Sequence, residues 1–285
     1  MAVSSDGKLL ATASNDTTIR VWDMQTGREK MTLTGHTDKV TFVLFTPDNK
    51  KLVSVSNDST IRTWDLTTGK EATVIRNGPA DEVPTMRLSS DGKTLRVWVS
   101  NRTVETYDLE KGERTSSFEG HDRDLYCLTF STDGSLAALG CVDGTVRFWD
   151  LTKEQKVGED LPAHAERMAD VVFTPDKKTL ITADGVGNLK IWDFATRKVT
   201  KELPKQKSYV IGFAMSSDGK RFASAHMNNV VNLWDVATGK IIRSWDMKVP
   251  EHPTKPFIWG MTFTPDNKKI VTANGNTTAF VLDCP

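Results

Sequence analysis

The amino-acid sequence predicts an all-β fold built from seven similar units, each with four short antiparallel strands. Three observations support this prediction. A Trp-Asp pair or a near equivalent recurs seven times, a tight turn recurs in the same register, and apolar segments with a two-residue period lie between these marks. A repeat array generally acts through the surface that it presents, so positions that differ among the copies are the candidates for function.

Each pair closes a strand-like segment. The seven pairs are Trp22-Asp23, Trp64-Asp65, Tyr107-Asp108, Trp149-Asp150, Trp192-Asp193, Trp234-Asp235 and Leu282-Asp283. Successive pairs lie 42 or 43 residues apart, except for the last interval, which is 48 residues. So regular a period indicates one structural unit copied seven times. We therefore expect a single domain over residues 1–285, with units that end near residues 23, 65, 108, 150, 193, 235 and 283.

Turns and flanking strands define the rest of each unit. Pro47-Asp48-Asn49-Lys50 is one of the seven turns, in which Pro presets the backbone and Asn tolerates the left-handed conformation at the end. Apolar segments such as residues 42–45 and 51–55 flank the turn, and a third such as residues 18–22 follows. A Gly-containing turn then leads to a fourth, such as residues 30–33. Four strands in roughly 42 residues are typical of one β-propeller blade, so the sequence predicts a seven-bladed β-propeller.

The strand count is uneven at the seventh unit. The chain starts at Ala2-Val3-Ser4, which reads as the end of a first strand, and stops just after the third strand of the last unit. We therefore expect the last blade to be incomplete, with three strands. The alternative is that Met1 is not the start of the natural domain. An unpaired edge at this blade would attract partner strands.

Composition narrows the function classes. Lys plus Arg and Asp plus Glu are both 37, and this balance argues against a general nucleic-acid surface. No apolar segment approaches the ~18 residues of a membrane span, and no signal sequence is seen. The three cysteines form no CxxC pair, which fits a reducing compartment. We expect a cytoplasmic protein with neither nucleic-acid nor membrane partners.

The repeated marks resemble those of the WD-repeat β-propeller family over nearly the whole chain. Gly-His dipeptides at Gly35-His36 and Gly120-His121 add to the resemblance. The resemblance implies a buried hydrogen-bonded network of His, Ser or Thr, Asp and Trp in each blade. In the second unit these are His36, Ser56, Asp58 and Trp64, and in the fourth they are His121, Asp143 and Trp149, with Cys141 in the serine position.

The other units depart from this network. The fifth unit has His164 and Trp192, with Val186 where the aspartate is expected. His226 stands in the serine position of the sixth unit and is expected to face the core. The chain therefore reads as a degenerate member of the family, in which alternation and turn chemistry maintain the fold.

The histidines and aspartates do not indicate catalysis. No two histidines have HxxxH or HxH spacing, so no metal site is expected. The repeated aspartates stand in turns, where their side chains accept hydrogen bonds from nearby backbone N–H groups. GxSxG, P-loop and dinucleotide-binding glycine patterns are absent. We expect no cofactor and no enzymatic activity.

Candidate binding residues follow from the resemblance. In similar propellers, partner-binding side chains stand three and five residues after the His position and just before the turn Asp position, on one rim of the central channel. Here the rim is mixed and polar in units two to five and aromatic in units six and seven. A Pro-rich loop at residues 248–256 accounts for the long last interval. The predicted partner-binding residues are Tyr126, Arg167, Tyr209, Ile211, Met227, Phe257 and Trp259.

The sequence favours a non-enzymatic scaffold that binds a protein or peptide through this rim, since clustered aromatic and Met side chains suit an interface core. A structural alternative for the same side chains is that they fill the channel mouth or cover the seventh blade. Two functional alternatives remain. One is a propeller-type hydrolase or lactonase with His and carboxylates around a metal. The other is a sensor or docking domain of a longer chain.

Overall fold

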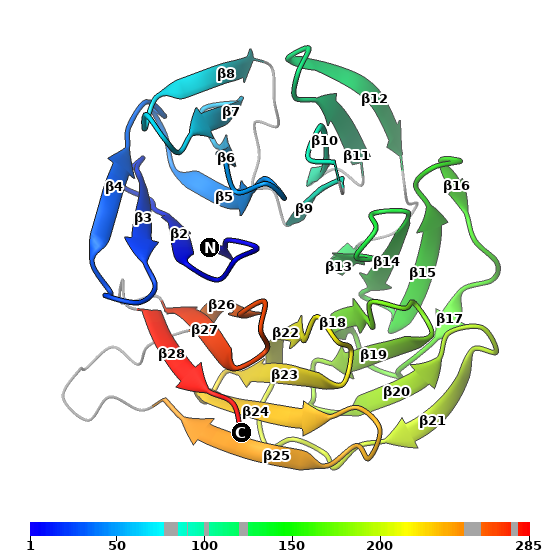
Figure 1. The fold of residues 1–285 in the computed structure, drawn as a ribbon. Coiled ribbons are helices and arrows are strands. Elements are labelled where there is room, and N and C mark those ends of the chain that lie inside the picture. The colour runs from blue at the N-terminus through cyan, green and yellow to red at the C-terminus, as the bar shows by residue number, and fades with distance from the viewer. Residues whose placement is uncertain (77–84, 90, 100–102, 120–124, 248–257, 275–278) are drawn as a thin grey trace. The chain divides into compact units, whose positions relative to one another are not determined.

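The computed structural model describes residues 1–76, 85–89, 91–99, 103–119, 125–247, 258–274 and 279–285 (Figure 1). These residues form 28 strands in seven antiparallel sheets, and they contain no helix. The expected fold class, an all-β seven-bladed propeller, is confirmed. Two compact units, Met1–Asp122 and Arg123–Pro285, are described separately below. Treating residues 1–285 as one domain stays a prediction.

The first unit holds three four-stranded sheets, each in chain order. The first sheet comprises β1 (Ala2–Val3), β2 (Leu9–Ala13), β3 (Ile19–Asp23) and β4 (Glu29–Leu33). The second comprises β5 (Val40–Phe45), β6 (Lys51–Ser56), β7 (Thr60–Asp65) and β8 (Glu71–Arg76). The third comprises β9 (Thr85–Leu88), β10 (Thr94–Val99), β11 (Thr103–Asp108) and β12 (Glu113–Glu119).

The second unit holds four sheets. The fourth sheet comprises β13 (Leu125–Phe130), β14 (Leu136–Cys141), β15 (Thr145–Asp150) and two short outer strands, β16 (Gln155–Lys156) and β17 (Leu161–Pro162), which both pair with β15. The fifth comprises β18 (Met168–Phe173), β19 (Thr179–Asp184), β20 (Leu189–Asp193) and β21 (Lys198–Glu202). The sixth comprises β22 (Val210–Met215), β23 (Arg221–His226), β24 (Val230–Asp235) and β25 (Ile241–Asp246).

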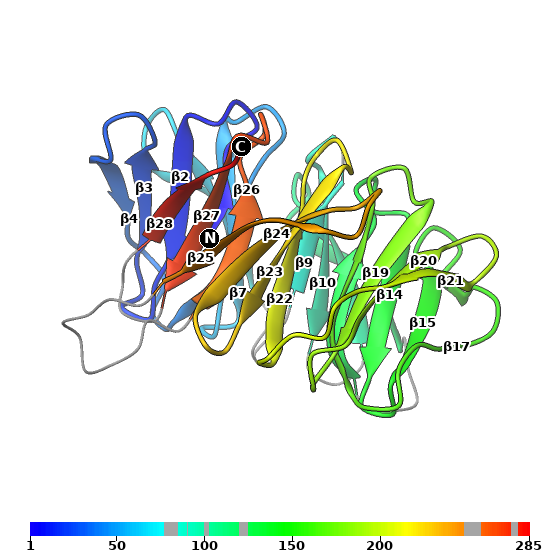
Figure 2. The same cartoon turned by 90° about the horizontal axis from the view of Figure 1, so that it is seen from below.

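The seventh sheet has fewer described strands than the other six. It comprises β26 (Ile258–Phe263), β27 (Lys269–Asn274) and β28 (Ala279–Asp283). Among the described residues it therefore has three strands, as the sequence predicts. It packs against the sixth sheet through buried residues that include Leu233, Ile258 and Ile270, and Figures 1 and 2 show these strands side by side.

The turn between the first two strands of each sheet is built in the same way in all seven. A Ser or Thr hydroxyl donates to the turn aspartate two residues later, and the same carboxylate accepts the N–H of the residue two positions further on. In the second sheet, Thr46 Oγ1 lies 2.6 Å from Asp48 Oδ1, and Asn49 has a φ of 57°. These hydrogen bonds hold the pKa of Asp48 below its ordinary value. The turn aspartates thus have a conformational role.

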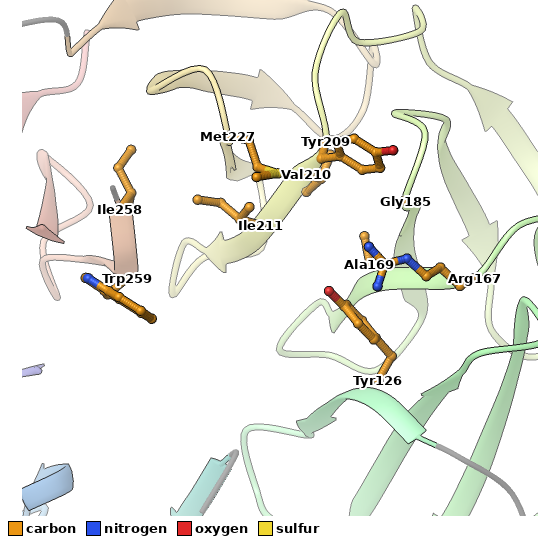
Figure 3. A pocket seen from close by; sticks show the side chains of 10 residues that line it. All are labelled: Tyr126, Arg167, Ala169, Gly185, Tyr209, Val210, Ile211, Met227, Ile258 and Trp259. Atoms are coloured by element: carbon orange, nitrogen blue, oxygen red, sulfur yellow. The ribbon is translucent and has the colours of Figure 1, made fainter. Parts of the chain in front are cut away.

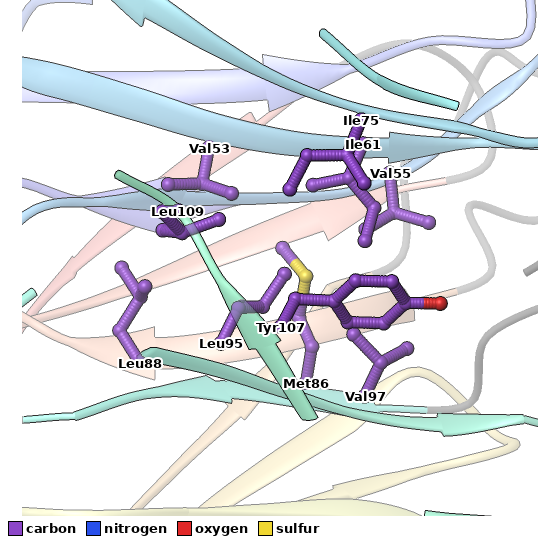
Figure 4. Close-up of a cluster of buried hydrophobic side chains, with 10 residues drawn as sticks. All are labelled: Val53, Val55, Ile61, Ile75, Met86, Leu88, Leu95, Val97, Tyr107 and Leu109. Atoms are coloured by element: carbon purple, nitrogen blue, oxygen red, sulfur yellow. The ribbon is translucent and has the colours of Figure 1, made fainter. Parts of the chain in front are cut away.

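Within each compact unit, apolar side chains fill the space between neighbouring sheets. Figure 4 shows this core between the second and third sheets, where Val53 and Ile61 face Leu95 and Tyr107. All four side chains are fully buried. Each such burial contributes about 1.5–3 kcal/mol of transfer free energy, so the packed faces hold the strand ends in place.

No helix in the described part of the chain is long and apolar enough to cross a membrane.

Candidate functional site

In five of the seven sheets, the described part of the first strand carries a β-bulge near its beginning. Four of these bulges lie in the second compact unit, Arg123–Pro285. There the pairing register of the first and second strands shifts between Leu125 and Cys127, Met168 and Asp170, Val210 and Gly212, and Ile258 and Gly260. One extra residue lies inside each shift. A bulge re-aims the extra side chain relative to the alternation of the strand. The extra residues are Tyr126, Ala169, Ile211 and Trp259.

The residues that flank these bulges are joined by backbone hydrogen bonds. Gly185 N donates to Arg167 O at 2.9 Å, and Met227 N donates to Tyr209 O at 3.0 Å. Each bond connects the residue before a first strand with the residue after the second strand. Side chains from both positions therefore stand at the same strand ends as the bulge residues.

These strand ends surround a cavity of about 230 Å³, which we call the strand-end pocket (Figure 3). Four of its large lining side chains are exposed: Trp259 is 73% exposed, Met227 49%, Tyr126 49% and Tyr209 47%. Exposed apolar groups of this size on rigid strands are typical of interaction sites. The pocket is lined by Tyr126, Arg167, Ala169, Gly185, Tyr209, Val210, Ile211, Met227, Ile258 and Trp259.

The structure brings six of the seven predicted partner-binding residues together in this pocket. These are Tyr126, Arg167, Tyr209, Ile211, Met227 and Trp259, whereas Phe257 lies outside the described residues. That they bind a partner stays a prediction. Val210 and Ile258, which are not among the predicted residues, also line the pocket and are buried. Each of them stands directly before a bulge residue. They could therefore be recognised from the sequence only if the position of the bulge were already known.

Arg167 is the charged side chain among the described residues of the strand-end pocket. Its guanidinium lies 4.3 Å from the centre of the Tyr126 ring, a distance typical of a cation–π contact. Gly185 faces it, and a Cβ at that position would lie 3.1 Å from Arg167 Nε. Within the described residues, no carboxylate lies within ion-pair distance of Arg167.

The carboxyl group of Asp170 joins the first strands of the fifth and sixth sheets. Asp170 Oδ1 accepts the N–H of Val171 at 2.8 Å, and Asp170 Oδ2 accepts the N–H of Phe213 at 2.6 Å. The second bond ties β18 to β22. Burial raises the pKa of Asp170 to about 7, although both hydrogen bonds act in the opposite direction.

The second blade contains a complete buried network. His36 Nδ1 lies 2.8 Å from Asp58 Oδ2, and His36 Nε2 lies 2.7 Å from Ser54 Oγ. Trp64 Nε1 donates to the same Ser54 Oγ at 2.8 Å. The placement of Ser56 in this network is therefore wrong. Its hydroxyl donates to Asp38 O and accepts the N–H of Asp58.

The error at Ser56 has a simple cause. Ser54 and Ser56 stand two residues apart on β6, so both side chains point to the same face and alternation does not distinguish them. The hydroxyl that meets the indole lies ten residues before the Trp. The same spacing recurs at Thr12 with Trp22, Thr182 with Trp192, and Ser224 with Trp234, at 2.9–3.0 Å.

In the fifth and sixth blades, the residue two positions after this hydroxyl replaces a missing member of the network. Asp184 Oδ2 lies 3.4 Å from His164 Nδ1, so Asp184 takes the aspartate role that Val186 was expected to leave empty. In the sixth blade His226 Nε2 lies 2.9 Å from Ser224 Oγ, so His226 replaces the missing Gly-His histidine. His226 does not stand in the hydroxyl position itself, but it is buried, as predicted.

The fourth blade is described only in part. His121 lies outside the described residues. Asp143 Oδ1 accepts both the N–H and the hydroxyl of Thr145, at 3.1 and 2.6 Å. The position ten residues before Trp149 is Leu139, so this blade has no hydroxyl there, and Cys141 instead contacts Leu139 O through its sulfur.

The histidines of these networks are buried and uncharged at neutral pH. Burial lowers the pKa of His36 and His226, and it lowers the pKa of His164 to about 4. Across the described part of the chain, no three His, Cys, Asp or Glu side chains are grouped so as to hold a metal ion.

Replacing Ser54 by Ala should lower the free energy of unfolding by about 2–3 kcal/mol, because the buried His36 and Trp64 nitrogens both lose their partner. The matched variant Ser56→Ala should cost about 1 kcal/mol, because it removes bonds to backbone groups at the strand end. Urea unfolding of both variants measures the difference. A larger loss in Ser56→Ala would show that the network is not as described.

The sequence is similar to those of known repeat proteins. The family "WD domain, G-beta repeat" matches residues 1–23, 27–65, 112–150 and 197–235. The small ribosomal subunit protein RACK1 of Drosophila melanogaster is 32% identical over 208 residues, which make up 71% of this chain and 63% of the relative.

Two further relatives are longer proteins. The apoptotic protease-activating factor 1 of Rattus norvegicus is 29% identical over 68% of this chain and 16% of its own length. The nuclear distribution protein PAC1 of Coccidioides posadasii is 30% identical over 66% of this chain and 35% of its own length. The chain thus spans less than two thirds of each of these relatives.

Proposed function

Because the chain belongs to the WD-repeat family of β-propellers, we propose that it is a non-enzymatic scaffold that binds a protein or peptide partner at the strand-end pocket. One observation carries the proposal. Trp259, Tyr209 and Met227 expose large apolar surfaces on adjacent strand ends that a packed core holds rigid. Aromatic and Met side chains are the residue types enriched at interface centres.

The exposure of Trp259 bears on the structural alternative. A side chain that fills a gap in the core or covers a weak blade loses most of its contact with water, but Trp259 is 73% exposed. Ile211, by contrast, is half-buried and packs against the core of the sixth and seventh sheets. The pocket therefore combines an exposed aromatic anchor with side chains that are anchored from below.

The cellular setting that we propose is the cytoplasm. The three cysteines form no disulfide, which agrees with a reducing compartment. The RACK1 relative is a protein of the small ribosomal subunit, so that protein acts within a larger assembly. We propose that this chain, too, acts by assembling with other proteins and not by chemical conversion of a substrate.

The test begins with peptides selected from a phage-displayed random library by the immobilised full chain. Titration of a labelled selected peptide should show at least about tenfold weaker binding to Trp259→Ala and Tyr209→Ala, since anchor residues contribute about 2 kcal/mol or more. The thermal melts of both variants should stay close to that of the wild type, because the lost side chains are exposed.

The matched control is Ile242→Ala on β25, which removes an apolar side chain that is 41% exposed outside the pocket. It should leave the affinity unchanged. Unfolding of Trp259→Ala and Tyr209→Ala would support the structural alternative instead, and equal weakening by all three variants would argue against a site at the pocket.

A further inference from the structure

The strand-end pocket has a polar wall and an apolar wall. Among the described residues that line it, Arg167 is the sole charged one, and Tyr126 and Gly185 stand beside its guanidinium. Ile211, Met227 and Trp259 lie on the other side of the pocket (Figure 3). A ligand that fits both walls combines a negative charge with an apolar group.

The surroundings of Arg167 favour the binding of a carboxylate by its guanidinium. Its contact with the Tyr126 ring orients the planar guanidinium, which reduces the entropy lost when the donors are engaged. A Cβ at position 185 would come within 3.1 Å of Arg167 Nε, so glycine at that position leaves room for the guanidinium. In the described residues, none of the carboxylates of the chain itself neutralises it. A guanidinium that is already oriented and has no carboxylate partner can bind a carboxylate through two parallel hydrogen bonds.

The size of the pocket limits the apolar group. Its volume of about 230 Å³ is smaller than the roughly 300–1,000 Å³ of most small-molecule sites. It therefore suits one or two side chains of a peptide better than a whole cofactor. Phosphorylated motifs are generally held by clusters of arginines, whereas the described lining of this pocket contains one. A single cation matches a single carboxylate.

Building on the function proposed above, we propose that the partner is a peptide segment that presents an Asp or Glu side chain to Arg167. An adjacent large apolar or aromatic side chain of that segment enters the pocket between Ile211, Met227 and Trp259. The carboxylate determines the orientation of the segment, and the apolar side chain supplies most of the buried area.

The experiment uses the full chain and the peptides selected as above, labelled with fluorescein and titrated by fluorescence anisotropy. Arg167→Glu should weaken the binding of an acidic selected peptide by about tenfold or more, because a charge-assisted hydrogen bond is lost and two negative charges meet. The same peptide with its Asp or Glu replaced by Lys should bind Arg167→Glu better than it binds the wild type. Added NaCl should weaken the wild-type complex.

The matched control is Arg243→Glu. Arg243 also stands over an aromatic ring, 5.2 Å from the centre of Trp245, but it lies on β25 outside the pocket. This variant has the same change in net charge and should bind the acidic peptide like the wild type. Equal thermal melts for the wild type and both variants exclude unfolding as the cause of a difference.

The outcomes separate this inference from the proposed function. Selected peptides that lose affinity for Trp259→Ala but show no acidic preference and no response to Arg167→Glu would overturn the carboxylate assignment and leave the scaffold standing. At least tenfold tighter binding of a phosphoserine analogue than of the acidic peptide would also overturn it. Failure to select any peptide that depends on the pocket would overturn both.

Discussion

Lowering the pH from 7.5 to 5 should reduce the free energy of unfolding of the wild type by about 2 kcal/mol more than that of the variant His164→Gln. The pKa of His164 is about 4 in the folded chain, because burial disfavours the charged imidazole, against an ordinary value of 6.5. Between these values the unfolded chain takes up a proton that the folded chain refuses. The contribution is therefore complete above pH 6.5 and is lost as the pH falls toward 4.

Urea unfolding at pH 7.5, 6 and 5 measures this effect as the difference between the wild type and His164→Gln. The difference is needed because Asp170 acts in the opposite sense. Its pKa is raised to about 7 in the folded chain, so its protonation stabilises the fold as the pH falls. The variant should be less stable at pH 7.5, since Thr182 and Asp184 lose their partner. A wild type and variant with parallel pH profiles would show that His164 is not buried as described.

Replacing Gly144 by Ala should lower the free energy of unfolding by about 2–5 kcal/mol. Gly144 has a φ of 81°, and an L side chain in this left-handed region costs about 1–2 kcal/mol. A Cβ at this position would also lie 2.2 Å from the carbonyl oxygen of His164 and 2.7 Å from that of Glu166. Backbone cannot move aside as a side chain can, so we expect a further cost of about 1–3 kcal/mol.

The matched variant is Gly158→Ala in the same blade. Gly158 has a similar φ of 68°, but a Cβ there would meet no heavy atom within 4 Å. It should therefore show the backbone cost alone. Urea unfolding of both variants isolates the close approach between the fourth and fifth blades. Equal losses in the two variants would contradict the packing of Gly144 against the backbone at His164.

The parts of the fold that could be predicted are those with a local chemical cause. The third strand of each blade ends at the predicted residue, from Asp23 to Asp283, because the Trp-Asp pair and the turn that follows are local signals. The turn aspartates kept their predicted conformational role, because an Asp side chain bonds to backbone two residues away wherever the turn forms.

The parts that could not be predicted depend on contacts between strands. The sequence predicts Ser56 as the hydroxyl of the second-blade network, whereas the structure has Ser54 there, because a shift of two residues leaves the face of a strand unchanged. The substitute roles of Asp184 and His226 depend on which side chains meet across a blade. The pocket residues were located through resemblance, since no sequence pattern marks a bulge residue such as Ile211 or Trp259.

The bulges also affect how the residues of the proposed binding surface can change during evolution. Elsewhere on a strand, exchanging a polar for an apolar residue conflicts with the face that its position must occupy. A bulge residue is exempt from this alternation, and at the equivalent position the blades carry Thr41, Tyr126, Ala169, Ile211 and Trp259. Where the bulge residue is exposed, as at Tyr126 and Trp259, recognition can therefore diversify one blade at a time by single substitutions that leave the stability of the scaffold nearly untouched. These exposed positions are natural sites for redesigning partner choice.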